Sequence, residues 1–206
     1  MILKRMLPFS KELLERACQK GDIVIDATMG NGHDTRYLAD LVGKDGQVFA
    51  FDVQKEAIEQ TSKRLGEHYP YVHLIHDGHE QLAEHLPAEA YGHISGAVFN
   101  LGYLPGGDKT VTTQAHTTIE AINQLMDWLK PGGLIVLVIY HGHPEGKKEK
   151  DILLDYCKTL HHEEVQVISY QYMNIQNDPP FVVAMKKNSN PLNGFEFFLF
   201  NKRIGQ

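Results

Sequence analysis

Short apolar runs alternate with amphipathic segments along most of this chain, and a polar residue follows nearly every run. The runs are rich in Val, Ile and Phe, which predicts buried strands at residues 23–25, 48–51, 72–75, 94–99 and 134–140. The segments between them have helical apolar spacing, at residues 33–42, 55–65, 80–85, 113–129 and 147–160, and an earlier helix is predicted to start at Ser10. This alternation predicts an α/β fold with a mostly parallel sheet and helices on both faces.

The end of the chain is expected to add antiparallel strands. Residues 165–172 and 181–185 are predicted strands joined by a Pro-containing loop, which is too short for a parallel crossover. Together with the five earlier strands, they predict a seven-stranded sheet whose last strand is antiparallel. A further β-like stretch at residues 195–200 precedes a basic tail.

Composition excludes several classes of protein. The chain has 206 residues, which suits a single domain spanning 1–206, and its formal charge of -6 argues against an overall basic nucleic-acid surface. The longest apolar run, 134–140, is far too short to cross a membrane, and there is no secretory h-region. Two distant cysteines and twelve histidines form no metal-binding pattern, so no metal and a cytoplasmic location are expected.

The segment from Asp26 to Thr35 (DATMGNGHDT) connects a predicted strand to a predicted helix. Gly30 and Gly32 permit a tight turn and a close approach of the backbone to a ligand. Asp52 ends the next strand, 20 residues beyond Gly32, which is the spacing of an acid that binds ribose hydroxyls. The pattern predicts a cofactor that contains a nucleoside.

Charge favours one nucleoside cofactor over another. A dinucleotide loop carries a third glycine where this chain has Thr35, and Asp34 is a poor neighbour for a pyrophosphate. Carboxylates at Asp34 and Asp26 suit the sulfonium and amino groups of S-adenosylmethionine (SAM), so SAM is favoured over NAD(P). Asp77, after the third strand, either accepts a hydrogen bond from adenine or caps a helix.

Asn100-Leu101-Gly102-Tyr103 follows the fourth predicted strand and resembles the [Asp/Asn]-Pro-Pro-[Tyr/Phe] motif of amino methyltransferases. The amide oxygen of Asn100 can accept a hydrogen bond from an attacking amine and offset the charge that develops on its nitrogen. The Tyr103 ring can stabilise a cation or stack on a base. The alternative is a Gly/Pro-rich turn that contains an asparagine.

Two further features have both a functional and an ordinary interpretation. The loop 140–146, with His141 and His143, follows the most apolar strand and either shapes a substrate pocket or is a polar connection. Clusters of basic residues either form solvated surface or converge on RNA phosphates. These clusters are Lys4/Arg5, Lys147/Lys148/Lys150, Lys186/Lys187 and Lys202/Arg203.

Four motifs together resemble the YtqB/MnmM family, which is also called the rRNA methylase family. They lie at residues 26–35, 100–109 (NLGYLPGGDK), 140–146 (YHGHPEG) and 177–181 (NDPPF). The resemblance covers a core of about residues 8–187, and the 100–109 block is its most specific part. His141 departs from the proline expected there, and the segment 188–206 is an extra C-terminal extension.

The resemblance implies a class I SAM-dependent methyltransferase with a Rossmann-like fold and S-adenosylhomocysteine (SAH) as product. It also implies N-methylation of 5-aminomethyl-2-thiouridine at the tRNA wobble position, giving 5-methylaminomethyl-2-thiouridine. The expected partner is therefore the tRNA anticodon stem-loop, and the extension leaves a homodimer possible. The alternatives are an rRNA or small-molecule methyltransferase, a non-catalytic SAM- or RNA-binding module, and an NAD(P) oxidoreductase.

The resemblance finally implies roles for individual residues. Asn100 and Tyr103 are the expected catalytic residues, and Tyr103 and His143 are candidates for a general base. The expected SAM site comprises Asp26, Thr28, Gly30, Asn31, Gly32, His33, Asp34, Thr35, Asp52, Val53, Gln54, Asp77, Gly78, His79, Asn100 and Leu101. The expected substrate side comprises Gly102, Tyr103, Asp108, Lys109, His141, His143, Asn177, Pro179 and Pro180.

Overall fold

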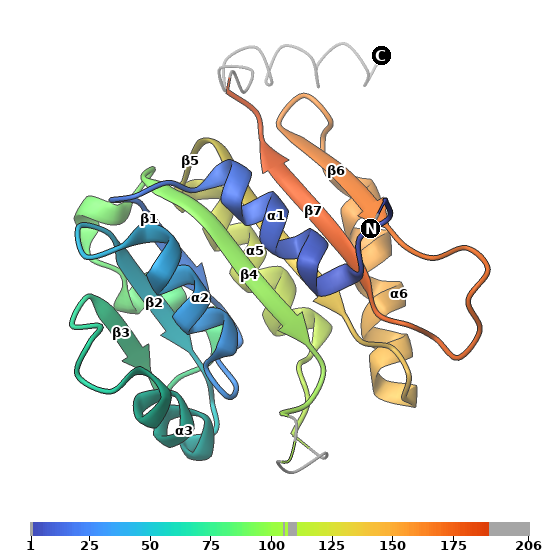
Figure 1. The fold of residues 1–206 in the computed structure, drawn as a ribbon. Coiled ribbons are helices and arrows are strands. Elements are labelled where there is room, and N and C mark those ends of the chain that lie inside the picture. The colour runs from blue at the N-terminus through green and yellow to red at the C-terminus, as the bar shows by residue number, and fades with distance from the viewer. Residues whose placement is uncertain (1, 105, 107–110, 190–206) are drawn as a thin grey trace.

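The computed structural model describes residues 2–104, 106 and 111–189, and its centre is a seven-stranded sheet (Figure 1). The strand order is β3-β2-β1-β4-β5-β7-β6, and β7 is antiparallel to both of its neighbours while β1 to β5 are parallel. This confirms the predicted mostly parallel sheet with an antiparallel last strand. The strands are β1 (Ile23–Asp26), β2 (Gln47–Phe51), β3 (Val72–Ile75), β4 (Ile94–Leu101), β5 (Leu129–Ile139), β6 (Val165–Tyr170) and β7 (Phe181–Lys187).

Helices cover both faces of the sheet, because strands buried on two sides need apolar cover on both (Figure 1). On one face, Leu14 of α1 and Leu38 of α2 pack in a core with Val136 of β5. On the other face, Ile122 of α5 and Leu153 of α6 pack in a second core. The helices are α1 (Met6–Ala17), α2 (His33–Val42), α3 (Lys55–Leu65), α4 (Leu82–His85), α5 (Ala115–Trp128) and α6 (Pro144–Thr159), with short 3₁₀ turns η1 (His79–Gln81) and η2 (Ala88–Ala90).

The helix at 55–65 and the strand at 72–75 have the predicted bounds, but the end of α5 differs. Residues 131–133 (Pro-Gly-Gly) were expected to follow the helix as a turn, whereas they lie inside β5, which begins at Leu129. Leu129 is fully buried and pairs with Ile94 of β4. The next pair along β4 is Gly96 with Leu134, so the register is irregular here and residues 130–133 of β5 are accommodated as extra residues.

The predicted start of the first helix is wrong. The helix α1 begins at Met6, and Ser10 lies buried inside it, with its Oγ donating to the Leu7 carbonyl at 2.8 Å. Pro8 is tolerated because it lies in the first turn of α1, where backbone N–H groups have no partner within the helix and the lack of one costs no hydrogen bond. The helix α6 also begins earlier than predicted, at Pro144.

The strand β4 extends to Leu101, so Asn100 is its second-last residue and does not follow the strand as predicted. The predicted β-like stretch 195–200 lies outside the described residues. Within the described ranges, no helix has the length and apolar character required to span a bilayer.

Gly96 allows α1 to pack closely on β4, which yields a test of this contact. A Cβ at position 96 would lie 2.6 Å from the Cys18 Sγ. We expect Gly96→Ala to lower the free energy of unfolding by about 1–3 kcal/mol in urea titrations. Adding Cys18→Ala should recover part of this loss. Gly142→Ala is the control, because a Cβ there meets no atom within 4 Å; an equal loss in both glycine variants would contradict the packing argument.

Candidate active site

The carboxyl ends of β1, β2, β4 and β5 meet at one edge of the sheet and carry most of the predicted site residues. The chain leaves β1 toward β2 on one side and reaches β4 on the other side of β1. Ligands of open α/β sheets bind in the crevice at this reversal, outside the strand ends. The candidate site is therefore the crevice formed by the loop after β1 and the end of β4.

The loop between β1 and α2 is held in shape by two glycines and by α3. Gly30 and Gly32 have φ values of 52° and 74°, which favour glycine, and Gly32 precedes the first turn of α2. A Cβ on Gly32 would lie 2.6 Å from the Thr61 Oγ1, and this hydroxyl donates to the Gly30 carbonyl at 3.1 Å. Arg64 donates its Nε–H to the Asn31 carbonyl at 2.6 Å and lies 3.0 Å from the His33 Nε2.

Asp52 connects this loop to the start of α3. Its Oδ2 accepts from the Gly30 N–H and its Oδ1 from the Gln54 N–H, both at 2.9 Å. Burial raises the pKa of this carboxyl, while the two backbone N–H groups oppose the rise. Each carboxylate oxygen retains a further lone pair, and Asp52 is only partly buried, so the group fits a pair of ribose hydroxyls. The neighbouring Val53 is 57% exposed.

Asp26 lies beneath the loop rather than on its surface. Its side chain is fully buried, and its Oδ2 accepts from the Thr35 Oγ1 at 2.6 Å. Burial, followed by the negative charge of Asp34, raises the pKa of Asp26 to about 7. A direct contact between Asp26 and a cofactor thus stays a prediction, whereas its support of the loop is visible in these bonds.

Asn100 joins the two sides of the crevice. Its backbone N–H donates to the Thr28 Oγ1 at 2.7 Å, and its Nδ2 donates to the Asp34 Oδ2 at 2.8 Å. The other Asp34 oxygen lies 3.3 Å from the Lys11 Nζ of α1. No role was predicted for Lys11, because nothing in the sequence of its helix distinguishes it from a surface lysine.

The segment after β4 is clamped from α6. The Gly102 N–H donates to the Thr113 Oγ1 at 2.9 Å, and the Thr113 N–H donates back to the Gly102 carbonyl at 3.0 Å. The Thr113 hydroxyl in turn donates to Glu149, which is buried, at 2.8 Å. Burial raises the pKa of Glu149. Neither Thr113 nor Glu149 was predicted as a site residue, because they lie 36 residues apart in the sequence and only the fold brings them together.

Tyr103 and His143 lie next to each other beside this clamp. Their ring centroids are 5.6 Å apart, and Tyr103 is 39% exposed. The His143 Nδ1 accepts from the Gly146 N–H at 2.7 Å and so caps α6. Leu101, by contrast, is fully buried and packs in the core. Asp108 and Lys109 lie outside the described residues.

The segment after β3 excludes the helix-cap alternative for Asp77, and its contact with adenine stays a prediction. Asp77 accepts from the Gly78 N–H at 2.8 Å and lies 2.8 Å from the His85 Nε2, which lowers the pKa of Asp77. It caps no helix, because Gly78 is the residue that precedes η1. His79 is buried, with its Nδ1 3.0 Å from the Ala27 carbonyl, so its ring supports the loop after β1 from inside.

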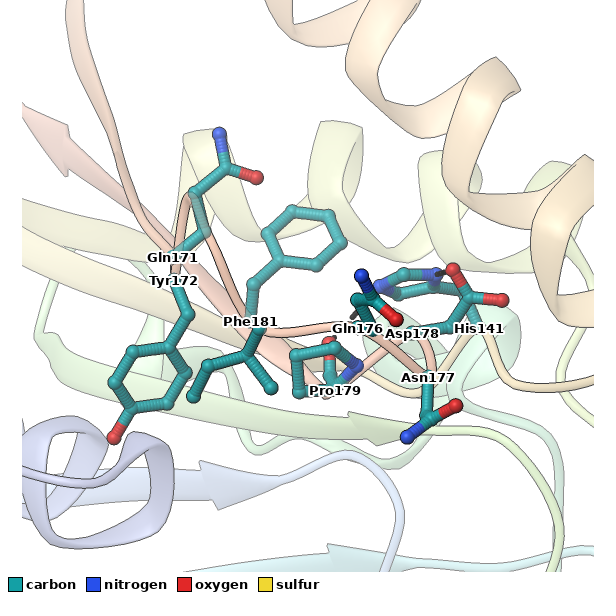
Figure 2. A pocket seen from close by; sticks show the side chains of 9 residues that line it. His141, Gln171, Tyr172, Gln176, Asn177, Asp178, Pro179 and Phe181 are labelled. Atoms are coloured by element: carbon teal, nitrogen blue, oxygen red, sulfur yellow. Dashed lines mark hydrogen bonds and ion pairs between the residues drawn. The ribbon is translucent and has the colours of Figure 1, made fainter.

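A small pocket lies between His141 and the loop that joins β6 to β7 (Figure 2). The His141 Nε2 is 3.0 Å from the Pro179 carbonyl, and Asp178 pairs with Lys147 at 2.8 Å. Pro180 is the last residue before β7. The pocket is lined by His141, Gln171, Tyr172, Ile175, Gln176, Asn177, Asp178, Pro179 and Phe181.

The residues of the crevice fit a cationic nucleoside cofactor. Asp26, Asp34 and Asp52 are close enough for the negative charges of Asp34 and Asp52 to raise the pKa of Asp26. Binding a cation relieves such repulsion, and Asp52 provides hydroxyl acceptors. Among the described residues, no group of three His, Cys, Asp or Glu side chains is placed to hold a metal ion.

Comparison with known proteins identifies the family. Residues 48–186 match the family model "Putative rRNA methylase". The chain is 38% identical over 185 residues to the tRNA (mnm(5)s(2)U34)-methyltransferase, chloroplastic, of Arabidopsis thaliana, a match that covers 85% of this chain and 67% of that protein. The chain therefore belongs to the "Putative rRNA methylase" family, as the sequence motifs predicted.

Two solved structures share both sequence and fold. A crystal structure of a family protein from Clostridium thermocellum, named as an rRNA-methylase, is 38% identical, covers 90% of this chain and 98% of that chain, and has a TM-score of 0.86. A methyltransferase from Streptococcus mutans in complex with SAH is 39% identical, covers 90% of this chain and 99% of that chain, and has a TM-score of 0.81. The fold is that of the class I SAM-dependent methyltransferases.

The raised pKa of Asp26 predicts how stability changes with pH. Between its usual value near 4 and about 7, the folded protein holds a proton that the unfolded chain releases, so the free energy of unfolding falls as the pH rises through this window. Asp26→Asn removes this titration and should make the slope shallower by up to about 1.4 kcal/mol per pH unit. Urea unfolding of both proteins across this range measures the difference. Equal slopes in the two proteins would show that Asp26 is ionised throughout.

Proposed function

We propose that this protein is a SAM-dependent methyltransferase that N-methylates 5-aminomethyl-2-thiouridine at the wobble position of tRNA. The proposed substrate is supported by the 38% identity, over 85% of the chain, to a protein named as a tRNA (mnm(5)s(2)U34)-methyltransferase. The observation that supports amine chemistry is Asn100, which stands at the carboxyl end of β4 beside the candidate cofactor loop.

The cofactor side of the crevice is formed by the loop after β1 and by Asp52. When bound there, SAM supplies an activated methyl group and leaves as SAH. In this arrangement Asp52 holds the ribose hydroxyls, and the glycine loop presents backbone rather than side chains to the cofactor. The carboxylates of the crevice favour the positive charge of SAM.

The substrate side is formed by Asn100, Gly102 and Tyr103. The uridine amine must be neutral to attack, and its nitrogen becomes positive as the N–C bond forms and the methyl–sulfur bond breaks. The Asn100 amide oxygen orients an amine N–H and offsets this charge, and the Tyr103 ring adds a cation–π contact. The clamp from Thr113 and Glu149 keeps the backbone of Gly102 in place for both.

The proposed activity is tested by incubating the purified protein with SAM and with tRNA that carries 5-aminomethyl-2-thiouridine. Nucleosides from the digested tRNA are then separated and weighed by mass spectrometry. We expect the wobble nucleoside to gain the mass of one methyl group only when SAM is present. Methylation of ribosomal RNA, with the wobble nucleoside unchanged, would replace this proposal by the rRNA alternative.

Asp52 is expected to contribute to SAM affinity. Removing its carboxylate loses a charge-assisted hydrogen bond of about 1.5–3 kcal/mol, so Asp52→Ala should weaken SAM binding roughly tenfold or more. Calorimetry with SAM measures this, with Asp151→Ala as a control because the Asp151 side chain is 70% exposed on α6. Unchanged affinity in Asp52→Ala would place the ribose elsewhere.

Asn100 is expected to serve methyl transfer more than cofactor binding. Loss of one oriented group that stabilises the transition state costs about 10²–10³ in rate, so Asn100→Ala should slow single-turnover methylation of tRNA by that factor. SAM affinity of the same variant should stay close to that of the wild type. A near-normal rate would reduce Asn100 to a structural residue of β4.

A further inference from the structure

The side chain of Asp34 lies between the candidate catalytic residue and a lysine from another helix. Asp34 is in the first turn of α2, and its side chain is 20% exposed. One of its oxygens accepts from the Asn100 Nδ2 at 2.8 Å, and the other lies 3.3 Å from the Lys11 Nζ. Lys11 is itself held 4.5 Å above the Tyr37 ring.

The chemistry of this contact fixes which way the Asn100 amide faces. An ionised carboxylate only accepts hydrogen bonds, so the amide must present its NH₂ group to Asp34. The backbone N–H of Asn100 is bound to Thr28 at 2.7 Å, which holds the base of the side chain in place. The amide oxygen is then the atom left for a ligand in the crevice.

We propose that Asp34 is a positioning residue for methyl transfer, which orients the Asn100 amide so that its oxygen faces the reacting amine, and that Lys11 of α1 holds Asp34 in place. This rests on the proposed function, since it needs an amine at Asn100. It differs from the expectation that Asp34 contacts the cofactor. It also gives α1 a part in the proposed active site. The helix α1 lies on the same face of the sheet as α2 (Figure 1).

The proposal makes the two positions interdependent. In Asn100→Asp, two carboxylates would meet at hydrogen-bonding distance and repel each other. In Asp34→Asn, the new amide would direct its oxygen to Lys11 and its NH₂ to position 100, so the Asn100 amide would turn and present its NH₂ to the substrate. In the exchange Asp34→Asn/Asn100→Asp, the donor and the acceptor are swapped, and position 100 again offers an oxygen to the amine.

The experiment compares these three variants with the wild type in single-turnover methylation of tRNA and in SAM binding. We expect each single variant to lose about tenfold or more in rate and the exchange to regain most of it, as for residues that share one hydrogen-bond network. SAM affinity should change less than about threefold in all of them, as expected of groups outside the cofactor contacts. Asp151→Asn is the matched control for loss of a carboxylate at an exposed site.

Three results would overturn the proposal. An exchange variant no faster than the product of the two single effects would show that the positions act independently. A loss of SAM affinity in Asp34→Asn equal to its loss of rate would make Asp34 a cofactor ligand instead. A wild-type protein that methylates no tRNA amine would overturn the proposed function itself, and the orientation of Asn100 for an amine would fall with it; activity in the wild type therefore separates the two failures.

Discussion

The hydrogen bond from the Asn100 N–H to the Thr28 hydroxyl, 2.7 Å long, connects the end of β4 to the loop that follows β1. β1 and β4 are parallel neighbours, yet the helices that follow them, α2 and α5, pack on opposite faces of the sheet. This divergence opens a crevice that neither helix fills. The bond links the two walls of this crevice, which carry the candidate cofactor loop and the candidate substrate residues.

The crevice concentrates negative charge and balances each carboxylate in a different way. Asp26 is buried, which raises its pKa to about 7. Asp52 accepts two backbone N–H groups, and Asp34 is shared between an amide and Lys11. The negative charges of Asp34 and Asp52 contribute to the raised pKa of Asp26, so a cationic ligand bound beside them would lower that pKa again.

Local sequence predicted the parts of this protein that depend on neighbours in the chain. The glycine loop, Asp52 and the helix at 55–65 follow from spacing and periodicity, and the parallel direction of β1 to β5 follows from their alternation with helices. The predicted start of α1 was wrong because Ser10 is a residue type that often caps helices. Here its hydroxyl instead donates to the Leu7 carbonyl within the helix. Lys11 and Glu149 could not be predicted, because their partners lie 23 and 36 residues away and only the fold brings them together.

The N-terminal helix packs against strands that are made much later. Phe9 of α1 stacks on Tyr170 of β6 with centroids 4.1 Å apart, and the Tyr170 hydroxyl donates to the Lys4 carbonyl. During synthesis, α1 is made before β6, so these contacts form only after β6 has left the ribosome. Lys11 reaches Asp34 from this helix, so this part of the candidate site depends on the docking of α1. A partly made chain that lacks β6 would thus carry the candidate cofactor loop without the contacts that hold α1 against this strand.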